Sequence, residues 1–186
     1  KYLKKCKIYN VSGPTECTCM CSGHKVTKKE LFSNKDIFVG KINKYFDYKI
    51  DKKSKYKNIG ELYLEGPAVS EGYINDKILT KKLFYNKKNF RGYKTGDIVK
   101  EYNNKNIKIL GRTDNQVKFL GHRIELEEIE KKINKVFKLS DCIVKLANKK
   151  TYPFLKLVLI TNKKTLTHGK IMKKLSERVP NYMIPE

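Results

Sequence analysis

The 186-residue sequence lacks any long apolar stretch. No apolar run reaches the roughly 18 residues that a membrane-spanning helix needs, and no charged segment followed by an apolar one opens the chain. We therefore expect a cytoplasmic protein. The sequence begins at Lys1 rather than a methionine, and a recognisable motif starts near residue 8. This pattern predicts the C-terminal piece of a longer protein.

Arginine is scarce although the chain is strongly basic. The net charge is +23, yet only four of the 42 lysine and arginine residues are arginine, namely Arg91, Arg112, Arg123 and Arg178. Proteins that read bases or phosphates usually rely on the planar fork of arginine, whereas the lysines here are scattered among asparagine, isoleucine and tyrosine. We therefore do not expect nucleic acid as the main partner. A basic surface would still attract acidic partners.

Paired cysteine motifs are also lacking. The five cysteines, an odd number that argues against a disulfide framework, are Cys6, Cys17, Cys19, Cys21 and Cys142. Three of them and His24 form a C-x-C-x-C-x-x-H cluster. Alternate residues of a strand share one face, so three thiols at this spacing need not converge on one tetrahedral ion. The favoured prediction is a strand with small, partly buried thiols, and the alternative is a zinc site.

A glycine-rich phosphate loop is absent as well. Gly169-Lys170 would need a glycine five residues earlier, where Lys164 stands. If this chain meets a nucleotide, another kind of motif must contact it.

What the sequence does contain is concentrated in residues 111–130, which read GRTDNQVKFLGHRIELEEIE. The alternation of Val117 and Phe119 predicts a strand between Gly111 and Gly121. After Gly121 the apolar period becomes that of a helix, and the first turn of this helix is acidic, as the helix dipole favours. We therefore predict a loop, a strand, a turn and a helix in this order.

With these residues in view, the stretch resembles the segment that joins the large and small domains of adenylate-forming enzymes. NQVK at residues 115–118 and RIEL at residues 123–126 resemble the sequence of the amino-acid-activating branch at this point. This branch comprises peptide-synthetase adenylation domains and D-alanine–carrier-protein ligases. Residues 59–84 also match the family. They begin with IGELYLEG, in which apolar and polar residues alternate as in a strand with one solvent-exposed face. VPNYMIP at 179–185 is nearest to the D-alanine ligases.

The resemblance implies an α+β fold with a domain boundary. Residues 1–111 would be the C-terminal part of the large domain, a β-rich, barrel-like subdomain, and residues 115–186 would form most of a small α+β domain. The hinge would be residues 112–114, with Asp114 as its pivot. The loop from Lys118 to Gly121 would face the pantetheine thiol during the thioester-forming step.

The resemblance also implies a nucleotide-binding turn at Gly13-Pro14-Thr15-Glu16. Thr15 would lie beside the phosphate and the acyl-adenylate, and Glu16 would hold Mg²⁺, which prefers carboxylate and phosphate oxygens. Gly13 and Pro14 would shape the turn around the nucleotide. Ser12 departs from the family, which usually carries an aromatic residue there to stack on adenine. A generic turn is the alternative.

Asp97, at the end of YKTGD, would bind the ribose hydroxyls of ATP, and Arg112 would also contact the nucleotide. An ionised carboxylate offers acceptors to two adjacent hydroxyl donors. An aspartate that caps the backbone amides of a turn is the alternative.

The function that the resemblance implies is that of an ATP- and Mg²⁺-dependent ligase. It would form an aminoacyl-adenylate and transfer the aminoacyl group to the phosphopantetheine thiol of an acidic carrier protein. The sequences LEEIE at residues 126–130 and PNYMIP at residues 180–185 favour D-alanine as the amino acid substrate. The alternatives are a peptide-synthetase domain for another amino acid, and a non-enzymatic interaction or nucleic-acid-binding module derived from a decayed ligase. The phosphate loop and the terminal catalytic lysine of the family lie outside this sequence, so we expect the 186-residue chain alone to be inactive.

Overall fold

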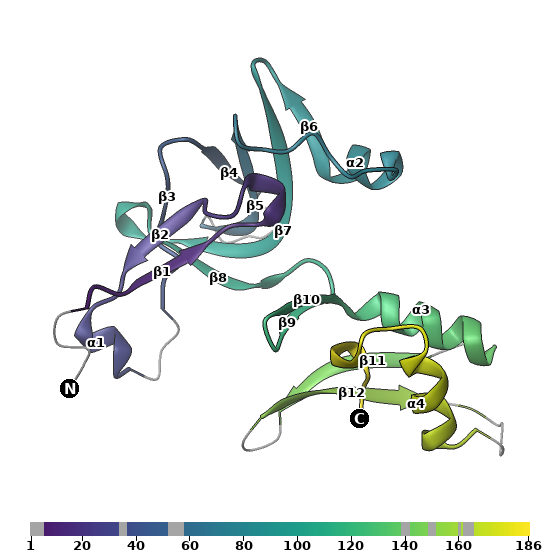
Figure 1. Cartoon of the computed structure of the whole chain (residues 1–186). Helices are drawn as coiled ribbons and strands as arrows, with labels where there is room; N and C mark the ends of the chain where they lie inside the picture. The colour runs from purple at the N-terminus through teal and green to yellow at the C-terminus, as the bar shows by residue number, and fades with distance from the viewer. Residues whose placement is uncertain are drawn as a thin grey trace. The chain divides into compact units, whose positions relative to one another are not determined.

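The computed structural model describes residues 6–33, 37–51, 58–138, 142–148, 152–159, 161 and 166–186. The chain divides into two compact units, Lys1–Thr113 and Asp114–Glu186. The first consists mostly of strands, and the second combines strands with two longer helices (Figure 1). This composition confirms the predicted α+β fold class.

Two antiparallel sheets build the first unit. The smaller sheet has the order β1-β2-β3, with bounds Tyr9–Ser12, Ser22–Lys25 and Lys41–Ile42. The larger has the order β4-β5-β7-β6, with β8 also paired to β7; the bounds of β4 to β8 are Asp47–Asp51, Ile59–Gly66, Phe84–Lys87, Phe90–Glu101 and Ile107–Arg112. Two short helices accompany them, α1 (Lys28–Leu31) and α2 (Lys77–Leu83). Within the described residues these are open sheets and not the closed barrel that the family resemblance implies.

Strand β5 lies in the middle of the larger sheet, and its two faces are both buried. The prediction that this strand has one solvent-exposed face was therefore wrong. Its polar side chains find partners on other strands of the same sheet. Glu65 accepts hydrogen bonds from the Tyr85 hydroxyl and the Lys87 ammonium of β6, and Tyr63 donates to Asp51 of β4 at 3.1 Å. A buried carboxylate is tolerated when it is paired in this way.

The second unit packs two hairpins and two helices around one core. The first hairpin consists of β9 (Gln116–Phe119) and β10 (His122–Glu125), and the second of β11 (Cys142–Asn148) and β12 (Pro153–Leu159). The helices are α3 (Leu126–Phe137) and α4 (His168–Ser176). Ile129 and Ile133, one helical turn apart on α3, are fully buried against Val144 and Leu155.

Strand β10 is a correction to the sequence prediction, which passed directly from a turn to the helix. Leu120 and Gly121 both have left-handed φ angles, 50° and 81°, and Phe119 pairs with His122. Two consecutive left-handed residues form the tight turn that matches the twist of a hairpin. The chain therefore returns as a strand before α3 begins at Leu126.

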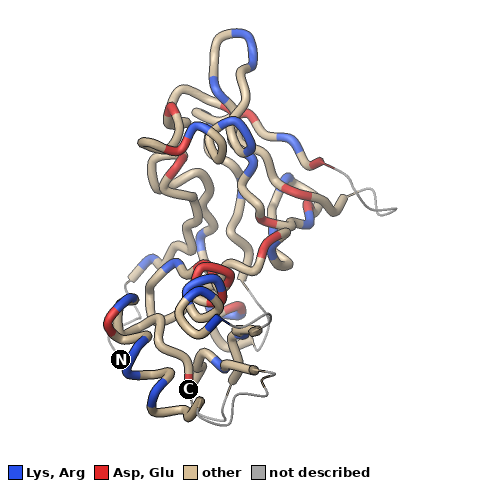
Figure 2. Tube along the Cα trace, turned by 90° about the vertical axis from the view of Figure 1, so that its right-hand side faces the viewer, with Lys and Arg blue, Asp and Glu red and all other residues tan. Residues whose placement is uncertain are grey.

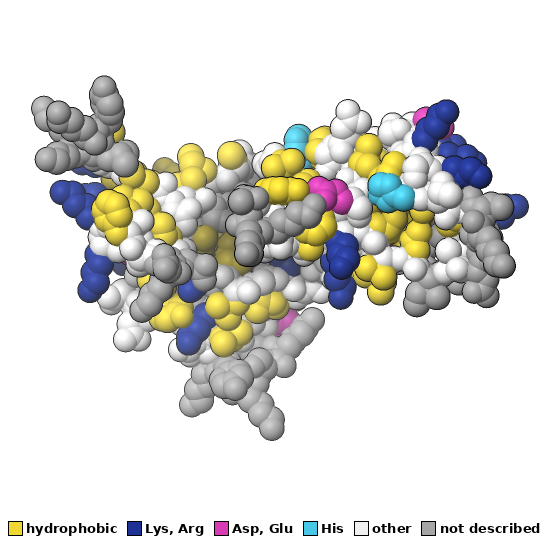
Figure 3. Space-filling model, turned by 90° about the horizontal axis from the view of Figure 1, so that it is seen from below, with side chains coloured by type: hydrophobic (Ala, Val, Ile, Leu, Met, Phe, Trp, Pro, Cys, Tyr) yellow, Lys and Arg dark blue, Asp and Glu magenta, His cyan; other side chains and the backbone are white. Residues whose placement is uncertain are grey.

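Charged side chains are distributed along the whole trace. Lys and Arg occur in both units, interspersed with Asp and Glu (Figure 2). On the face shown in Figure 3, basic side chains are separated by apolar and uncharged ones. No helix among the described segments has the length and apolar character needed to cross a membrane.

Candidate nucleotide site

The turn at residues 13–16 connects β1 to a short 3₁₀ helix, η2 (Thr15–Cys17). A Cβ atom placed on Gly13 would lie 2.5 Å from the carbonyl oxygen of Cys19 and 2.7 Å from the amide nitrogen of Cys21. Only glycine leaves room for this close approach of two backbone segments. The amide of Cys21 donates to the carbonyl of Ser12 at 2.9 Å, which holds the segments together.

The turn presents its two polar residues differently. Thr15 is exposed, whereas Glu16 is only 8% exposed. The Glu16 carboxylate accepts a hydrogen bond of 2.6 Å from the Tyr73 hydroxyl, and its backbone carbonyl accepts one of 2.8 Å from the amide of Ser70. Burial, followed by the hydrogen bond to Glu16, raises the pKa of Tyr73 well above its usual value. Tyr73 therefore remains a hydroxyl donor that orients the carboxylate.

Glu16 fits a magnesium ion only as one ligand among several. Among the described residues, no three His, Cys, Asp or Glu side chains form a group that could hold a metal ion. Protein magnesium sites often use one or two carboxylates and take further oxygens from substrate phosphates and water. Glu16 therefore has suitable chemistry if a bound nucleotide supplies phosphate oxygens.

Asp97 lies on β7 directly opposite Arg112 on β8. The Nη1 atom of Arg112 donates to Oδ1 of Asp97 at 2.6 Å, and the two side chains are 21% and 19% exposed. The pairing register shifts just beyond Asp97, between Ile98 and Val99, and Gly96 before it has a left-handed φ of 74°. Such irregularities change the direction of a side chain relative to a regular strand.

Thr95 supports this geometry from inside the unit. Its buried hydroxyl donates to the carbonyl of Leu62 at 2.8 Å and accepts from the amide of Asp97 at 3.0 Å. Sequence reasoning did not single out Thr95 or Tyr73 as site residues. Both occupy positions in the segments that resemble the family, which was the signal available for finding them.

The structure brings the turn and Asp97 together. Ser12, Gly13 and Pro14 line a cavity of about 20 Å³ with Asp97 and Cys21. This is room for about one water molecule, so the cavity marks a junction between segments and cannot enclose a nucleotide. With Arg112 bound to Asp97, most of the predicted nucleotide residues lie in this part of the first unit.

The three remaining predicted residues belong to the second unit. Asp114 is exposed, and its Oδ1 accepts from the amide of Gln116 at 3.2 Å. Lys118 is exposed on β9, and Gly121 completes the left-handed turn to β10. The division between the units falls immediately before Asp114, and Arg112 is the last residue of β8.

The cysteine cluster is not the strand that the sequence predicted. Cys17 ends η2, and Thr18 and Cys19 have left-handed φ angles of 53° and 78°. As a result, Cys17 and Cys21 are buried, whereas Cys19 is exposed. His24 forms a 2.8 Å hydrogen bond with Glu30. Cys17 and Cys21 therefore share a buried environment, whereas Cys19 faces solvent.

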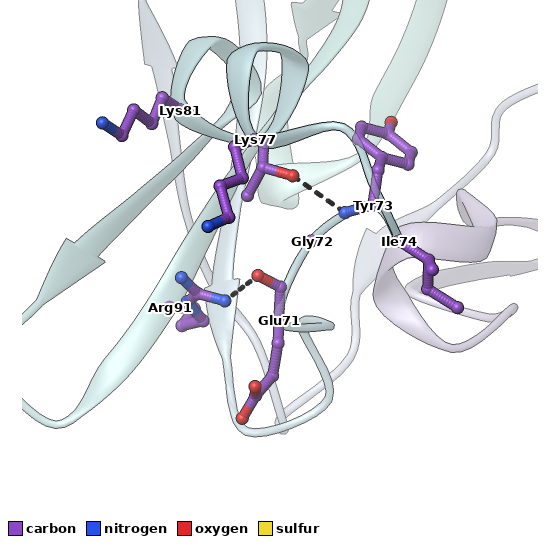
Figure 4. Close-up of a pocket in the computed structure, with 8 residues that line it drawn as sticks. Glu71, Gly72, Tyr73, Ile74, Lys77, Lys81 and Arg91 are labelled. Atoms are coloured by element: carbon purple, nitrogen blue, oxygen red, sulfur yellow. Dashed lines mark hydrogen bonds between the residues drawn. The ribbon is translucent and has the colours of Figure 1, made fainter.

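A larger hollow of about 430 Å³ lies beside α2, away from the predicted residues (Figure 4). Its cationic side chains are Lys77, Lys81 and Arg91, and the Arg91 guanidinium donates to the backbone carbonyl of Glu71. Tyr73 contributes to the wall, and its amide donates to Thr80 Oγ1 at 2.9 Å.

Comparison with known proteins identifies relatives along nearly the whole chain. Bacitracin synthase 2 of Bacillus licheniformis is 32% identical over 189 residues, which are 98% of this chain and 7% of that protein. A D-alanine–D-alanyl carrier protein ligase of Listeria monocytogenes is 32% identical over 191 residues, or 96% of this chain and 37% of that protein. No family model matches the sequence. The proteins that this chain resembles over nearly its whole length are adenylate-forming enzymes.

Solved adenylate-forming structures share the fold. The Vibrio cholerae adenylation domain AlmE, solved in complex with glycyl-adenosine-5'-phosphate, has a TM-score of 0.79 and 24% identity, covering 97% of this chain and 36% of that one. PA1221, a nonribosomal peptide synthetase protein with adenylation and PCP domains, has a TM-score of 0.75 and 24% identity over 97% of this chain and 37% of that one. The chain thus spans little more than a third of the D-alanine ligase that it matches.

Proposed function

We propose that this chain is the C-terminal part of an amino acid–carrier protein ligase. The enzyme would join ATP and an amino acid into an aminoacyl-adenylate, release pyrophosphate, and transfer the aminoacyl group to a phosphopantetheine thiol. The observation that carries the proposal is the junction of Gly13 and Pro14 with Asp97, 83 residues after Pro14 in the sequence, around one cavity.

Asp97 would bind the ribose. Its carboxylate has two acceptor oxygens, and a charged acceptor forms stronger hydrogen bonds with hydroxyl donors than a neutral one does. The Arg112 guanidinium donates to Oδ1 of Asp97 at 2.6 Å. Arg112 would thus both orient the carboxylate and add positive charge near the phosphates.

The exposed hydroxyl of Thr15 would donate to phosphate or acyl-adenylate oxygens, because the turn directs it to solvent while Glu16 points inward. Glu16, oriented by Tyr73, would be the protein ligand of Mg²⁺. When bound, this ion would neutralise charge on the phosphate oxygens.

D-alanine is the amino acid that we propose first. The supporting features are the sequence LEEIE at residues 126–130, the sequence PNYMIP at residues 180–185, and the 32% identity to a D-alanine–D-alanyl carrier protein ligase. The equal identity to bacitracin synthase 2 keeps a peptide-synthetase domain for another amino acid as the alternative. The net charge of +23 would speed encounter with an acidic carrier protein. Dependence on ATP is compatible with a cytoplasmic location.

The test is amino-acid-dependent ATP–pyrophosphate exchange by the full-length enzyme, with D-alanine compared against a panel of other amino acids. Exchange with D-alanine would support the proposal, and exchange with another amino acid only would support the alternative. No exchange with any amino acid would contradict the ligase assignment. The 186-residue chain alone is expected to give no exchange, because it does not contain the terminal catalytic lysine of the family. A lysine placed to stabilise developing charge contributes much of the rate.

Asp97→Ala in the full-length enzyme is expected to raise the KM for ATP by at least about tenfold, since charge-assisted hydrogen bonds contribute ~1.5–3 kcal/mol each. The matched control is Asp47→Ala, on the exposed side of β4. Asp47→Ala should leave the KM near the wild-type value. An unchanged KM for Asp97→Ala would mean that Asp97 does not bind the ribose and serves only as a structural ion-pair partner of Arg112.

A further inference from the structure

The thiols of Cys17 and Cys21 form a buried pair directly behind the turn. They are 0% and 2% exposed, and the two side chains interact with each other. The Cys21 sulfur also lies 3.5 Å from the backbone carbonyl oxygen of Cys17. The side chain of Cys21 is therefore folded back over residue 17, which places the two sulfurs side by side.

A small cavity lies beside this pair. Cys21 lines the cavity of about 20 Å³ that Pro14 and Asp97 also line. One of the other lining residues, Asp97, is partly exposed to solvent. A space that accommodates about one water molecule suits a reagent of similar size, such as hydrogen peroxide, and excludes larger thiol reagents.

The pair is also mechanically connected to the turn. Gly13 packs against the backbone at Cys19 and Cys21 with no room for even one additional carbon. The intervening residues Thr18 and Cys19 are both left-handed, a conformation that costs energy for residues other than glycine. A change in the backbone between residues 17 and 21 would therefore be transmitted to Gly13 and to Glu16, which directly precedes Cys17.

We infer that Cys17 and Cys21 are an oxidisable dithiol that hydrogen peroxide converts into a disulfide, and that this disulfide disables the turn. The Cys21 thiolate attacks one oxygen of the peroxide, so that a sulfur–oxygen bond forms, the oxygen–oxygen bond breaks and hydroxide leaves. The Cys17 sulfur then attacks the Cys21 sulfenic acid. The sulfur–sulfur bond forms and water leaves, carrying the proton of Cys17. The two thiols lose two electrons, and the peroxide gains them.

Thiol counting and peptide mapping test the chemistry on the purified chain without reference to any enzymatic activity. The reduced chain has five free cysteines. After peroxide treatment, we expect three thiols under denaturing conditions, a Cys17–Cys21 disulfide in the peptide map, and recovery of all five with dithiothreitol. Cys142 is the internal control, because it is a buried thiol whose hydrogen bond goes to the Glu130 carbonyl at 3.4 Å. The pair should react at least about tenfold faster than Cys142.

Two variants distinguish the dithiol from general thiol oxidation. Cys19→Ala removes the exposed neighbour and should leave disulfide formation intact, with four thiols before treatment and two after. Cys21→Ala should abolish the disulfide and protect Cys17. Should Cys21→Ala not fold, Cys17→Ala supplies the same comparison. The inference is overturned if Cys17 and Cys21 survive as thiols in wild-type protein, or if the disulfide that forms involves Cys19.

The effect on the turn rests on the proposed function and has its own measurement. ATP–pyrophosphate exchange by oxidised full-length enzyme should fall at least about tenfold and recover with dithiothreitol, whereas oxidised Cys21→Ala should match its own untreated sample. Unchanged exchange in the presence of a mapped disulfide would overturn the effect on the turn. If untreated enzyme shows no exchange, the proposed function fails, and thiol mapping together with the peroxide sensitivity of ATP binding decides the inference.

Discussion

At the scale of single residues, Gly13 is constrained by space and not by its own backbone angles. Its φ lies outside the left-handed region, but a Cβ atom there would meet three backbone atoms of the segment at residues 19–21. Backbone atoms cannot rotate away as the end of a side chain can. The close approach therefore depends on the absence of a side chain at this position.

Gly13→Ala is expected to destabilise the first unit by about 1–3 kcal/mol, the usual cost of forcing an extra carbon into a filled space. Gly169→Ala is the matched control, because Gly169 lies on α4 with nothing within 4 Å of its added Cβ. This second change should stabilise by about 0.5–1 kcal/mol, since alanine loses less entropy in a helix. Urea unfolding of both variants provides the measurement. Equal effects would show that the turn can move to accept a methyl group.

Glu30 gives a prediction that depends on pH. Hydrogen bonds from the hydroxyl and the amide of Thr27, at 2.6 and 2.8 Å, lower the pKa of Glu30 to about 2, with His24 contributing less. Because the folded pKa lies below the ordinary value of 4.5, this stabilisation is complete above pH 4.5 and is lost as the pH falls toward 2.

The side-chain carboxyl resonance of Glu30 is therefore expected to titrate near pH 2 in an NMR experiment. Thr27→Val keeps the shape of residue 27 but removes the hydroxyl donor, so it should raise the midpoint toward 4.5. A wild-type midpoint at the ordinary value would mean that the capping box at the start of α1 is not formed in solution.

At the scale of elements, the sequence predicted strands and helices where the apolar residues within one segment repeat with the period of a strand or a helix. The alternation in residues 59–66 corresponds to β5, and the apolar positions 126, 129 and 133 correspond to the buried face of α3. The burial of Glu65 was not predictable in this way, because its partners Tyr85 and Lys87 lie on β6, which enters the same sheet only by pairing with the far edge of β7. The same holds for the contact of Glu16 with Tyr73, 57 residues away.

Strand β10 was missed for a different reason. Its four residues, HRIE, contain a single buried apolar side chain, Ile124, which is too little for a period to be recognised. The turn before it was predicted, but Leu120 is not a residue expected in a left-handed conformation, so the tight hairpin form of the turn was not recognised. The predicted loop at Lys118 to Gly121 therefore becomes a strand end and a tight turn.

This turn leads to a stability prediction. Leu120 is exposed and left-handed, and asparagine adopts this conformation at lower cost. Leu120→Asn should stabilise the second unit by about 1 kcal/mol. Leu120→Ser, which also removes the exposed apolar side chain but has a weaker preference for the left-handed region, should stabilise less. Urea unfolding distinguishes the two variants, and destabilisation by asparagine would show that the Leu120 side chain has a packing role.

At the scale of the whole molecule, the division into two units falls at the residue that the sequence reasoning proposed as a pivot. The amide of Thr113 donates to the carbonyl of Gly96 at 2.8 Å, which binds this residue to the first unit. The side chain of Asp114 instead contacts Gln116, the first residue of β9. Adjacent residues are therefore held by different units.

The last prediction concerns that peptide. The family resemblance implies two arrangements of the small domain, one for adenylation and one for thioester formation, and a few backbone angles must absorb the change between them. Proline at position 114 would fix φ near −65° and restrict Thr113 as well. Asp114→Pro in the full-length enzyme should therefore spare one half-reaction and slow the other by at least about tenfold.

The measurements are ATP–pyrophosphate exchange for adenylation and loading of a phosphopantetheinylated carrier protein for thioester formation. Asp114→Ala is the control, because it removes the contact with Gln116 while leaving the backbone free to rotate, and it should preserve both steps. Equal loss of both half-reactions in Asp114→Pro would mean that the substitution disrupts folding. If both half-reactions keep their wild-type rates, the pivot must lie at another residue, because a fixed φ at position 114 would then have no effect on the exchange of arrangements.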